Sequence, residues 1–297
     1  MLIEAEFQNV TREEQTWRYH DAGQGPPVVL FHGFPDTPHS YAGIARALNQ
    51  AGYRTILPYL RGYHPDTLVP GRGYDLRSVA EDAIGLLDAL GLESAVLVGH
   101  DWGATVVYAA TALAPERVDA IVPIAIPHPK TLKPKNAIQG LGALFMARHL
   151  LYFQMPWSEA GTRRNDFAYL ETIYRRWGPN WRGAERDDAL RRAKEAFSDP
   201  DVLEGAIDWY RALFMKPKRP LPGLSKPLRT RALMVAGGKD FGGHLGPYKK
   251  SQALFEGGAE VLVMPDAGHW PHREDQPKFV AALIRFLRDT FSARQSG

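Results

Sequence analysis

The most informative segment of this chain is Val96-Leu97-Val98-Gly99-His100-Asp101-Trp102-Gly103-Ala104. An apolar run leads into the pattern Gly-x-Asp-x-Gly, and residues 105–113 continue with helical spacing. A strand that turns tightly into a helix can present the residue at the turn as a nucleophile, usually the serine of a Gly-x-Ser-x-Gly pattern. The two glycines fit because such a turn leaves no room for Cβ atoms on either side. We therefore predict a strand, a strained turn that exposes Asp101, and a helix.

Apolar runs of strand length recur on both sides of this stretch. Short continuous apolar runs are typical of strands buried in a parallel sheet. Helical patterns lie between them, such as the one that follows the predicted N-cap Asp75 and another near the C-terminus. This alternation predicts an α/β protein with a mostly parallel, doubly wound sheet. The predicted strands are residues 28–31, 55–57, 95–98, 120–124, 232–235 and 261–264.

The alternation of strands and helices stops after Ile126 and resumes near Arg231. The residues between are rich in Trp, Tyr, Phe and Arg, have helix-like spacing and contain no clear buried strand. We predict that residues 129–215 form a helical cap inserted into a core made of residues 1–128 and 216–297. The proline-rich residues 216–222 are the predicted return linker, because each proline blocks helix continuation and stiffens the connection.

The composition is that of a soluble globular protein, with 44% hydrophobic and 23% charged residues in 297. A net charge of +3 without a basic tract argues against a nucleic-acid partner. The N-terminus lacks the basic start and apolar run of a signal peptide, and no stretch reaches the ~18 apolar residues of a membrane span. We expect a cytoplasmic monomer or homodimer that binds neither nucleic acid nor membrane.

The absence of cysteine rules out thiolate nucleophiles and cysteine-bound metals. The chain also contains neither a His-Glu-x-x-His pattern nor a glycine-rich phosphate loop. We therefore expect no metal and no organic cofactor, so that oxygen and nitrogen groups carry the chemistry.

An aspartate nucleophile limits the reactions that are plausible. A carboxylate with a pKa near ~3.9 is ionised at neutral pH and needs no base to activate it. Its attack on an ester would give a high-energy anhydride, whereas its attack on an sp3 carbon that carries a leaving group gives an ordinary ester. Epoxides and alkyl halides are therefore favoured as substrates. The covalent ester then has to be broken by water, and a histidine is the natural base for that step.

The turn His32-Gly33-Phe34-Pro35 follows the predicted strand 28–31. In a fold with this elbow, such a turn supplies one of two backbone N–H donors for an oxyanion. We expect the N–H groups of Phe34 and Trp102 to hold one oxygen of Asp101, and later the oxyanion that forms when water attacks the ester. The rings of Phe34 and Trp102 are expected to add apolar walls.

The catalytic base is expected after the last strand, where Pro265-Asp266-Ala267-Gly268-His269 makes His269 the candidate. A carboxylate is needed to orient its imidazole and stabilise the cation. Asp240 follows the strand 232–235 and falls at the carboxyl end of that strand, where ligand sites of open sheets occur. Asp266 is the rival acid, although its closeness in sequence to His269 suggests a turn residue. The predicted triad is Asp101, Asp240 and His269.

Together these residues resemble the epoxide hydrolases of the α/β-hydrolase fold, over most of the chain. The matches are residues 32–35, 99–103, 238–241 and 268–270. Haloalkane dehalogenases share the Asp-Trp elbow but usually carry asparagine where this chain has Phe34, which cannot donate a side-chain hydrogen bond. Fluoroacetate dehalogenases share the His-Gly-Phe-Pro turn but typically have arginines where this chain has Trp102 and Thr105. The resemblance thus favours an epoxide substrate over a halide or a carboxylate.

The resemblance implies two cap donors that stabilise the leaving oxygen of the epoxide. Asp208-Trp209-Tyr210-Arg211 is similar to the family's Trp-Tyr-Arg segment, which makes Tyr210 one donor. At the other position the family usually has tyrosine, whereas this chain has His149; Tyr152 is the alternative if the register differs. A His and Tyr pair also serves the halide in fluoroacetate dehalogenases, so His149 leaves both chemistries open.

We therefore expect a hydrolase that converts a small apolar epoxide to a vicinal diol. The first alternative is a haloalkane or haloacetate dehalogenase with the same triad, whose halide would be held by His149, Trp102 and Tyr210. The second is a non-catalytic protein that keeps the fold and binds a ligand.

Overall fold

The computed structural model describes residues 6–69, 73–131, 148–216, 219–240 and 245–295. The first five residues, for which we expect no signal peptide, lie outside the described residues. So do 132–147 of the predicted cap, 217–218 of the predicted linker, and 241–244, which include Phe241 of a family match.

An eight-stranded sheet forms the centre of the described chain, with the strand order β1-β2-β4-β3-β5-β6-β7-β8. The strands from β4 to β8 in this order run parallel, and β1 and β2 add an antiparallel edge. The bounds are β1 (Phe7–Arg12), β2 (Gln15–Ala22), β3 (Pro27–Phe31), β4 (Arg54–Pro58), β5 (Ala95–His100), β6 (Val118–Ile124), β7 (Arg231–Gly237) and β8 (Ala259–Met264).

All six predicted strands are confirmed, as β3 to β8. The sequence analysis missed β1 and β2. In β2 the buried Trp17 and Tyr19 alternate with less buried residues, and in β1 most positions are exposed. An antiparallel edge with one solvated face has no continuous apolar run, so a search for buried parallel strands passes over it.

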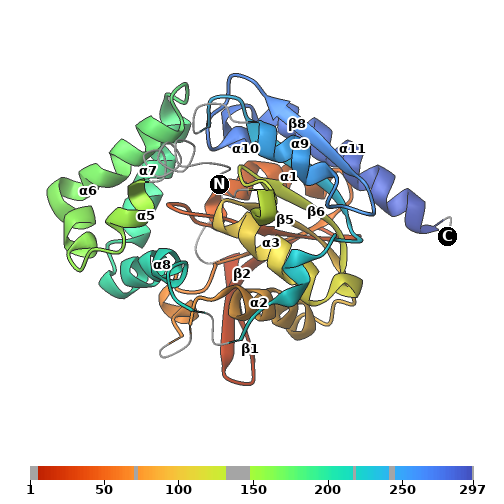
Figure 1. Cartoon of the computed structure of the whole chain (residues 1–297), viewed down its shortest axis with the longest axis horizontal. Coiled ribbons are helices and arrows are strands. Elements are labelled where there is room, and N and C mark those ends of the chain that lie inside the picture. Colours follow the sequence, from red (N-terminus) through yellow and green to blue (C-terminus); the bar gives the residue numbers. More distant parts are fainter. Residues whose placement is uncertain (1–5, 70–72, 132–147, 217–218, 241–244, 296–297) are drawn as a thin grey trace.

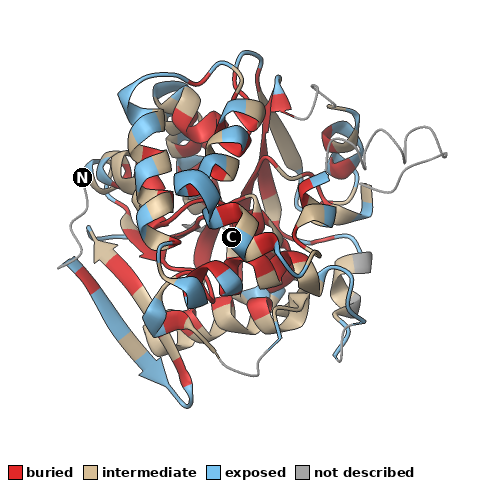
Figure 2. Ribbon diagram, turned by 90° about the vertical axis from the view of Figure 1, so that its left-hand side faces the viewer, coloured by how far each residue is buried: buried red, intermediate tan, exposed pale blue. Residues whose placement is uncertain are grey.

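Helices cover both faces of the sheet (Figures 1 and 2). The helices of the core are α1 (Ala42–Gln50), α2 (Leu76–Ala89), α3 (Trp102–Leu113), α9 (Gly246–Gln252), α10 (Pro271–Glu274) and α11 (Gln276–Gln295). The predicted N-cap of α2 is confirmed: the side chain of Asp75 accepts hydrogen bonds from the backbone N–H groups of Arg77 and Ser78.

Successive residues of each strand pack on opposite faces of the sheet, as the pleat requires. In β3, Val29 and Phe31 belong to the apolar cluster that contains α2 and α3, whereas Val28 and Leu30 belong to the one that contains α1 and α11. Both clusters are continuous across the sheet, so the central strands are buried on both sides (Figure 2).

Between β6 and β7 the described residues form a group of helices on one side of the sheet, away from α11 and the C-terminus (Figure 1). They are α5 (Arg148–Tyr152), α6 (Ser158–Trp177, with a break at 164–167), α7 (Ala184–Ala196) and α8 (Pro200–Ala212). None is long and apolar enough to cross a membrane, and the same holds for the other helices of the described residues.

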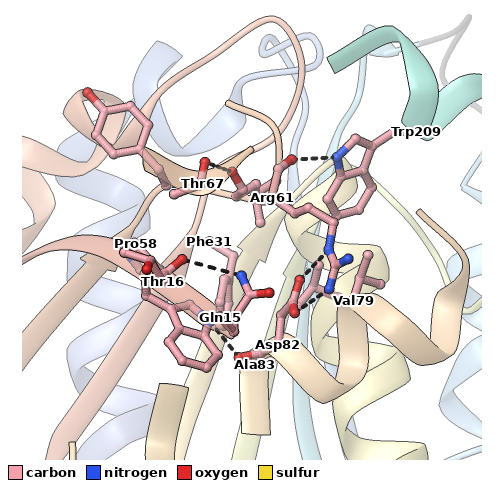
Figure 3. Close-up of a pocket in the computed structure, with 14 residues that line it drawn as sticks. Gln15, Thr16, Phe31, Pro58, Arg61, Thr67, Val79, Asp82, Ala83 and Trp209 are labelled. Atoms are coloured by element: carbon pink, nitrogen blue, oxygen red, sulfur yellow. Dashed lines mark hydrogen bonds and ion pairs between the residues drawn. The ribbon is translucent and has the colours of Figure 1, made fainter. Parts of the chain in front are cut away.

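A buried contact joins α8 to the core (Figure 3). The indole N–H of Trp209 donates to the carbonyl of Arg61, 2.9 Å away. The guanidinium of Arg61 in turn pairs with Asp82 on α2. A cavity of about 20 Å³ lies among these groups, which is room for about one water molecule. This contact fixes the position of Tyr210, the next residue along α8.

The strand register brings distant segments to one edge of the sheet. Phe31, the last residue of β3, pairs with Gly99 of β5, so the turn at 32–35 lies beside the elbow. Gly237 of β7 pairs with Met264 of β8, so the loops that carry Asp240 and His269 also start side by side. These are carboxyl ends of parallel strands, where ligands of open α/β sheets bind.

Candidate active site

Asp101 occupies a strained turn between β5 and α3. Its backbone has φ 52° and ψ −112°, a positive φ that is uncommon for any residue other than glycine. Such strain is characteristic of functional sites, where the surrounding structure holds it in place. The carboxylate is thereby lifted from the strand end, which is the geometry expected of a nucleophile elbow.

The glycines around Asp101 are required by space. A Cβ atom on Gly99 would lie 2.1 Å from the carbonyl oxygen of Gly103, and one on Gly103 would lie 2.1 Å from that of Phe31. A Cβ atom on Gly33 would lie 2.5 Å from the Cβ of Asp101. Real Cβ contacts are never this short, so any other residue would force the backbone to shift.

The predicted oxyanion donors lie beside the carboxylate. The backbone N–H of Phe34 donates to Oδ1 of Asp101 at 2.9 Å. Trp102 is the first residue of α3, a position where the backbone N–H has no partner within the helix. The positive end of the α3 dipole also lies here and favours negative charge.

The predicted base and acid meet Asp101 in the folded chain. Nδ1 of His269 lies 2.9 Å from Oδ2 of Asp240, and its Nε2 lies 3.3 Å from Oδ2 of Asp101. The ring of His269 is fully buried, and Asp240 is 8% exposed. The rival acid Asp266 is exposed, and its carbonyl accepts a hydrogen bond from Asn180 at a turn.

Charge balance in this cluster depends on the two carboxylates that flank His269. Burial lowers the pKa of its imidazole, but Asp240 and Asp101 outweigh that effect and raise the pKa to about 10. Burial likewise raises the pKa of Asp101, but the hydrogen bond and charge of His269 reverse this and leave it below its usual range. Asp101 is thus an ionised carboxylate at neutral pH, as a nucleophile must be.

Three groups that the sequence analysis missed hold the loop of His269. The carboxylate of Glu274 accepts from the N–H groups of Gly268 and Trp270. The N–H of His269 donates to the carbonyl of Trp177 at 2.8 Å. Nε2 of His100 lies 2.7 Å from the carbonyl oxygen of His269. The sequence carries no local signal for these contacts, because each joins separate segments or depends on how the loop folds back.

Tyr210 lies against the apolar walls of the site. Its ring contacts those of Trp102 and Phe34, with centroids 5.0 and 5.2 Å apart. Its hydroxyl is buried and forms no hydrogen bond of normal geometry with any described residue. Burial and the negative charge of Asp101 raise the pKa of Tyr210 well above its ordinary value, so the hydroxyl keeps its proton.

His149, rather than Tyr152, has its ring beside Tyr210. The rings of His149 and Tyr210 have centroids 5.6 Å apart. Burial lowers the pKa of His149 to about 3, so its imidazole is neutral and offers one N–H. The hydroxyl of Tyr152 donates to the carbonyl of Ser158, 3.4 Å away, within the helical insertion.

His32 braces the turn that carries Phe34. Its Nε2 accepts a hydrogen bond from the backbone N–H of Leu60 at 3.1 Å, and its Nδ1 lies 3.0 Å from the carbonyl oxygen of Gly33. Both ring nitrogens are engaged with backbone groups, so the ring acts on the turn and has no nitrogen left for a substrate.

Tyr63 is a further buried hydroxyl near the site that the sequence analysis did not single out. Its ring contacts His32 at 4.9 Å, and burial together with the charge of Asp101 raises its pKa well above the ordinary value. It follows β4 in a segment without a recognisable motif, and only the packing reveals its position.

Known proteins resemble this chain in sequence and fold. The family model described as "alpha/beta hydrolase fold" matches residues 26–276. The AB hydrolase superfamily protein YfhM of Bacillus subtilis (strain 168) is 35% identical over 195 residues, which cover 64% of this chain and 66% of that protein. Epoxide hydrolase A of Mycobacterium tuberculosis is 29% identical over 307 residues, covering 91% of this chain and 93% of that protein.

A solved structure also resembles this chain over nearly its whole length. The crystal structure of Epoxide Hydrolase A from Mycobacterium thermoresistibile superposes with a TM-score of 0.76 at 26% identity, covering 95% of this chain and 98% of that one. Since the family model matches residues 26–276, which are most of the chain, this chain belongs to the α/β-hydrolase fold family.

Proposed function

We propose that this chain is an epoxide hydrolase that works through a covalent ester on Asp101. The observation that carries the proposal is an ionised aspartate at the elbow, in contact with His269, with the protonated hydroxyl of Tyr210 close by. Relatives that match about nine-tenths of the chain at 27–29% identity bear the name epoxide hydrolase, which supports the same reaction.

In the first step a carboxylate oxygen of Asp101 attacks a ring carbon, and the bond between that carbon and the ring oxygen breaks. Negative charge develops on the leaving oxygen, which Tyr210 stabilises by donating its proton or a hydrogen bond. His149 is neutral and supplies a second N–H donor. The apolar rings of Phe34 and Trp102 exclude water and strengthen these interactions.

In the second step water attacks the carbonyl carbon of the Asp101 ester. Esterification removes the charge of Asp101, and with it part of what keeps His269 protonated, so the pKa of His269 falls and it can act as base. Asp240 orients the imidazole and stabilises its cation. The N–H groups of Phe34 and Trp102 bind the oxyanion. When the intermediate collapses, the expelled diol oxygen takes the proton that His269 removed from water, and the second water proton, left on Asp101, replaces any proton that Tyr210 gave up.

We further propose that residues 129–215 act as a cap over this site, with residues 1–128 and 216–297 as the core. The cap residues His149 and Tyr210 supply the donors for ring opening, while the core supplies nucleophile, acid and base. This division separates the binding of the leaving oxygen from the hydrolysis of the ester.

The test is to trap the ester. The variant His269→Gln, mixed with aryl and alkyl epoxides, should gain the full mass of the epoxide on the peptide that contains Asp101. The variant Asp101→Asn should gain nothing, and the wild type should release diol that chromatography detects. Asp266→Asn is the matched control, because this exposed carboxylate near His269 lies outside the proposed triad. An unmodified His269→Gln protein, with an epoxide that the wild type turns over, would refute the scheme.

A dehalogenase is the second candidate, and Trp102 is the observation that favours it. Its indole N–H is buried and forms no hydrogen bond of normal geometry with a described residue, and it lies beside Tyr210, so both could hold a halide. Haloalkanes and fluoroacetate are assayed in parallel, with halide release measured by ion analysis. Halide without diol would select this function, and a ligand that binds without any turnover would select a non-catalytic protein.

A further inference from the structure

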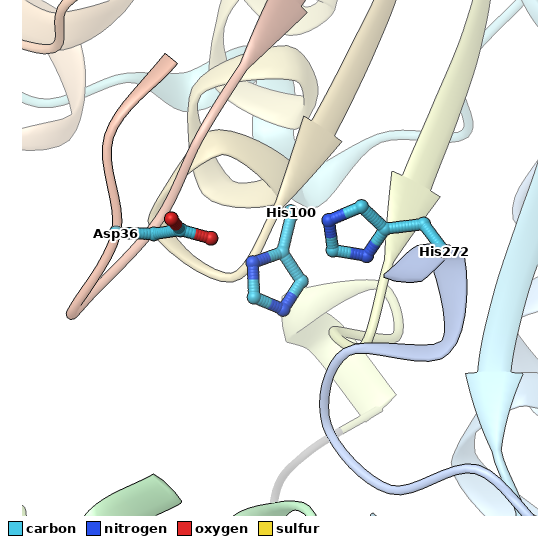
Figure 4. Close-up of side chains that lie close together, drawn as sticks. All are labelled: Asp36, His100 and His272. Atoms are coloured by element: carbon cyan, nitrogen blue, oxygen red, sulfur yellow. The ribbon is translucent and has the colours of Figure 1, made fainter. Parts of the chain in front are cut away.

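A second cluster of buried side chains lies behind the triad. Asp36, His100 and His272 converge there, and each offers one ligand atom within 4.8 Å of the other two (Figure 4). The two histidines are completely buried, and Asp36 is 3% exposed. Burying polar groups costs free energy unless they find partners, so such a cluster calls for an explanation.

The cluster has free lone pairs. Oδ2 of Asp36, Nδ1 of His100 and both ring nitrogens of His272 form no hydrogen bond of normal geometry with any residue that the structure describes. The state of His100 follows from its other nitrogen: Nε2 lies 2.7 Å from the carbonyl oxygen of His269, which can only accept. Nε2 therefore carries the proton, and Nδ1 presents a lone pair to the cluster. Carboxylate and imidazole acceptors outnumber donors here, which suits a cation.

We propose that Asp36, His100 and His272 bind one divalent transition-metal ion of the zinc class. Two neutral imidazoles and one carboxylate are a donor set that zinc and its neighbours prefer. Both rings are fully buried, and burial favours the neutral form of imidazole that binds a metal. The ligand atoms lie up to 4.8 Å apart and must approach one another before all three make bonds of ~2.0–2.2 Å to one ion.

The groups around the cluster match those that orient metal ligands. A ligating histidine generally donates its other N–H to a carbonyl or a carboxylate, as His100 donates to His269. The other oxygen of Asp36, Oδ1, accepts from the N–H of Thr37 at 2.9 Å and lies 3.7 Å from the guanidinium of Arg273. Arg273 thus engages Oδ1, and Oδ2 remains for the metal.

The position of the cluster gives the ion a structural role. Asp36 follows Phe34 by two residues, His100 directly precedes Asp101, and His272 follows His269 by three. A bound ion would cross-link the turn that carries the oxyanion donor, the end of β5 next to the nucleophile, and α10, which follows the base. Since all three ligands are buried, the ion can enter only when a loop opens, so we expect loading to be slow and to speed up on warming.

The experiment uses the full chain after treatment with a chelator. Calorimetry with Zn²⁺ should find one strong site per chain, and the midpoint of thermal unfolding should rise with metal concentration because the ion binds only the folded state. Co²⁺ should give the visible absorption of a low-coordinate nitrogen and oxygen site. These readouts do not depend on which substrate the enzyme turns over.

Two variants remove a ligand while they keep the packing. Asp36→Asn retains the acceptor for Thr37, and His272→Phe retains an aromatic ring against Tyr41 and Phe279. Each variant should weaken Zn²⁺ binding at least about 100-fold and abolish the Co²⁺ absorption. If one of the two variants does not fold, the other still tests the site. His128→Asn is the control, a fully buried histidine outside the cluster, and should bind as the wild type does. No binding by the wild type, or equal binding by both ligand variants, would overturn the proposal.

Discussion

Replacing Tyr210 by phenylalanine separates a catalytic role of its hydroxyl from a structural one. The hydroxyl is buried and forms no hydrogen bond of normal geometry with a described residue, so its removal breaks no such bond within the protein. The phenyl ring keeps the contacts with Trp102, Phe34 and Phe153. We therefore expect the free energy of unfolding to stay within about 0.5 kcal/mol of the wild-type value, or to rise, since a buried unpaired polar group is lost.

The rate of ester formation, unlike the free energy of unfolding, should fall clearly in Tyr210→Phe. A hydrogen bond to a developing negative charge contributes roughly 1.5–3 kcal/mol. At 1.36 kcal/mol for each factor of ten, the rate of ester formation should fall roughly 10- to 150-fold. His149 still supplies a neutral donor beside the site, which should keep the loss near the lower end of this range.

Single-turnover stopped flow measures the rate of ester formation, with tryptophan fluorescence as the signal because Trp102 and Trp177 contact the site. Urea denaturation gives the free energy of unfolding. Tyr152→Phe is the matched control, because its hydroxyl donates to Ser158 and it should leave the rate unchanged. A Tyr210→Phe enzyme with less than a threefold loss of rate, or one that unfolds more easily by several kcal/mol, would refute the reasoning.

Three other perturbations test the geometry. Asp240→Asn should lower the rate of diol formation by roughly a thousandfold through loss of the oriented imidazole, while Asp266→Asn changes it little, as steady-state assays of both can check. Because the pKa of His269 is raised to about 10 in the folded chain, its contribution to stability is complete below pH ~6.5 and is lost as the pH rises to about 10. Thermal melts should show this loss in the wild type, and His269→Gln should lack it. Gly99→Ala should lower the free energy of unfolding by about 1–3 kcal/mol, because its Cβ would lie 2.1 Å from a carbonyl oxygen. Gly246→Ala, with nothing within 4 Å, should stay near the wild type in urea denaturation.

The parallel part of the sheet could be predicted because each buried strand leaves its own continuous apolar run. The antiparallel edge was not predicted, because β1 and β2 are partly exposed to solvent and have no continuous apolar run. The helical character of α5 to α8 was also readable, but the contact of Trp209 with Arg61, which positions α8, joins residues that are distant in sequence.

In the candidate site, too, local motifs could be predicted from the sequence, whereas contacts between distant segments could not. Asp101 and its glycines form one local motif, and the positions of Asp240 and His269 after predicted parallel strands indicated that they lie at the carboxyl edge of the sheet. The choice between His149 and Tyr152 as the neighbour of Tyr210 needed the packing of the helices between β6 and β7. The positions of Tyr63 and Glu274 near the site likewise became clear only from the packing, because neither residue belongs to a recognisable motif.

The elbow, the parallel sheet and the identity of the candidate nucleophile, base and acid could all be predicted from local sequence, because backbone sterics and hydrophobic periodicity act over a few neighbouring residues. Which side chains from separate segments meet depends on how the whole chain folds. Asp36 lies in the loop after β3, His100 ends β5 and His272 lies in α10, and only the fold brings their ligand atoms together and buries them. Distance in space between such segments depends on the register and packing of the whole sheet, which no local pattern encodes.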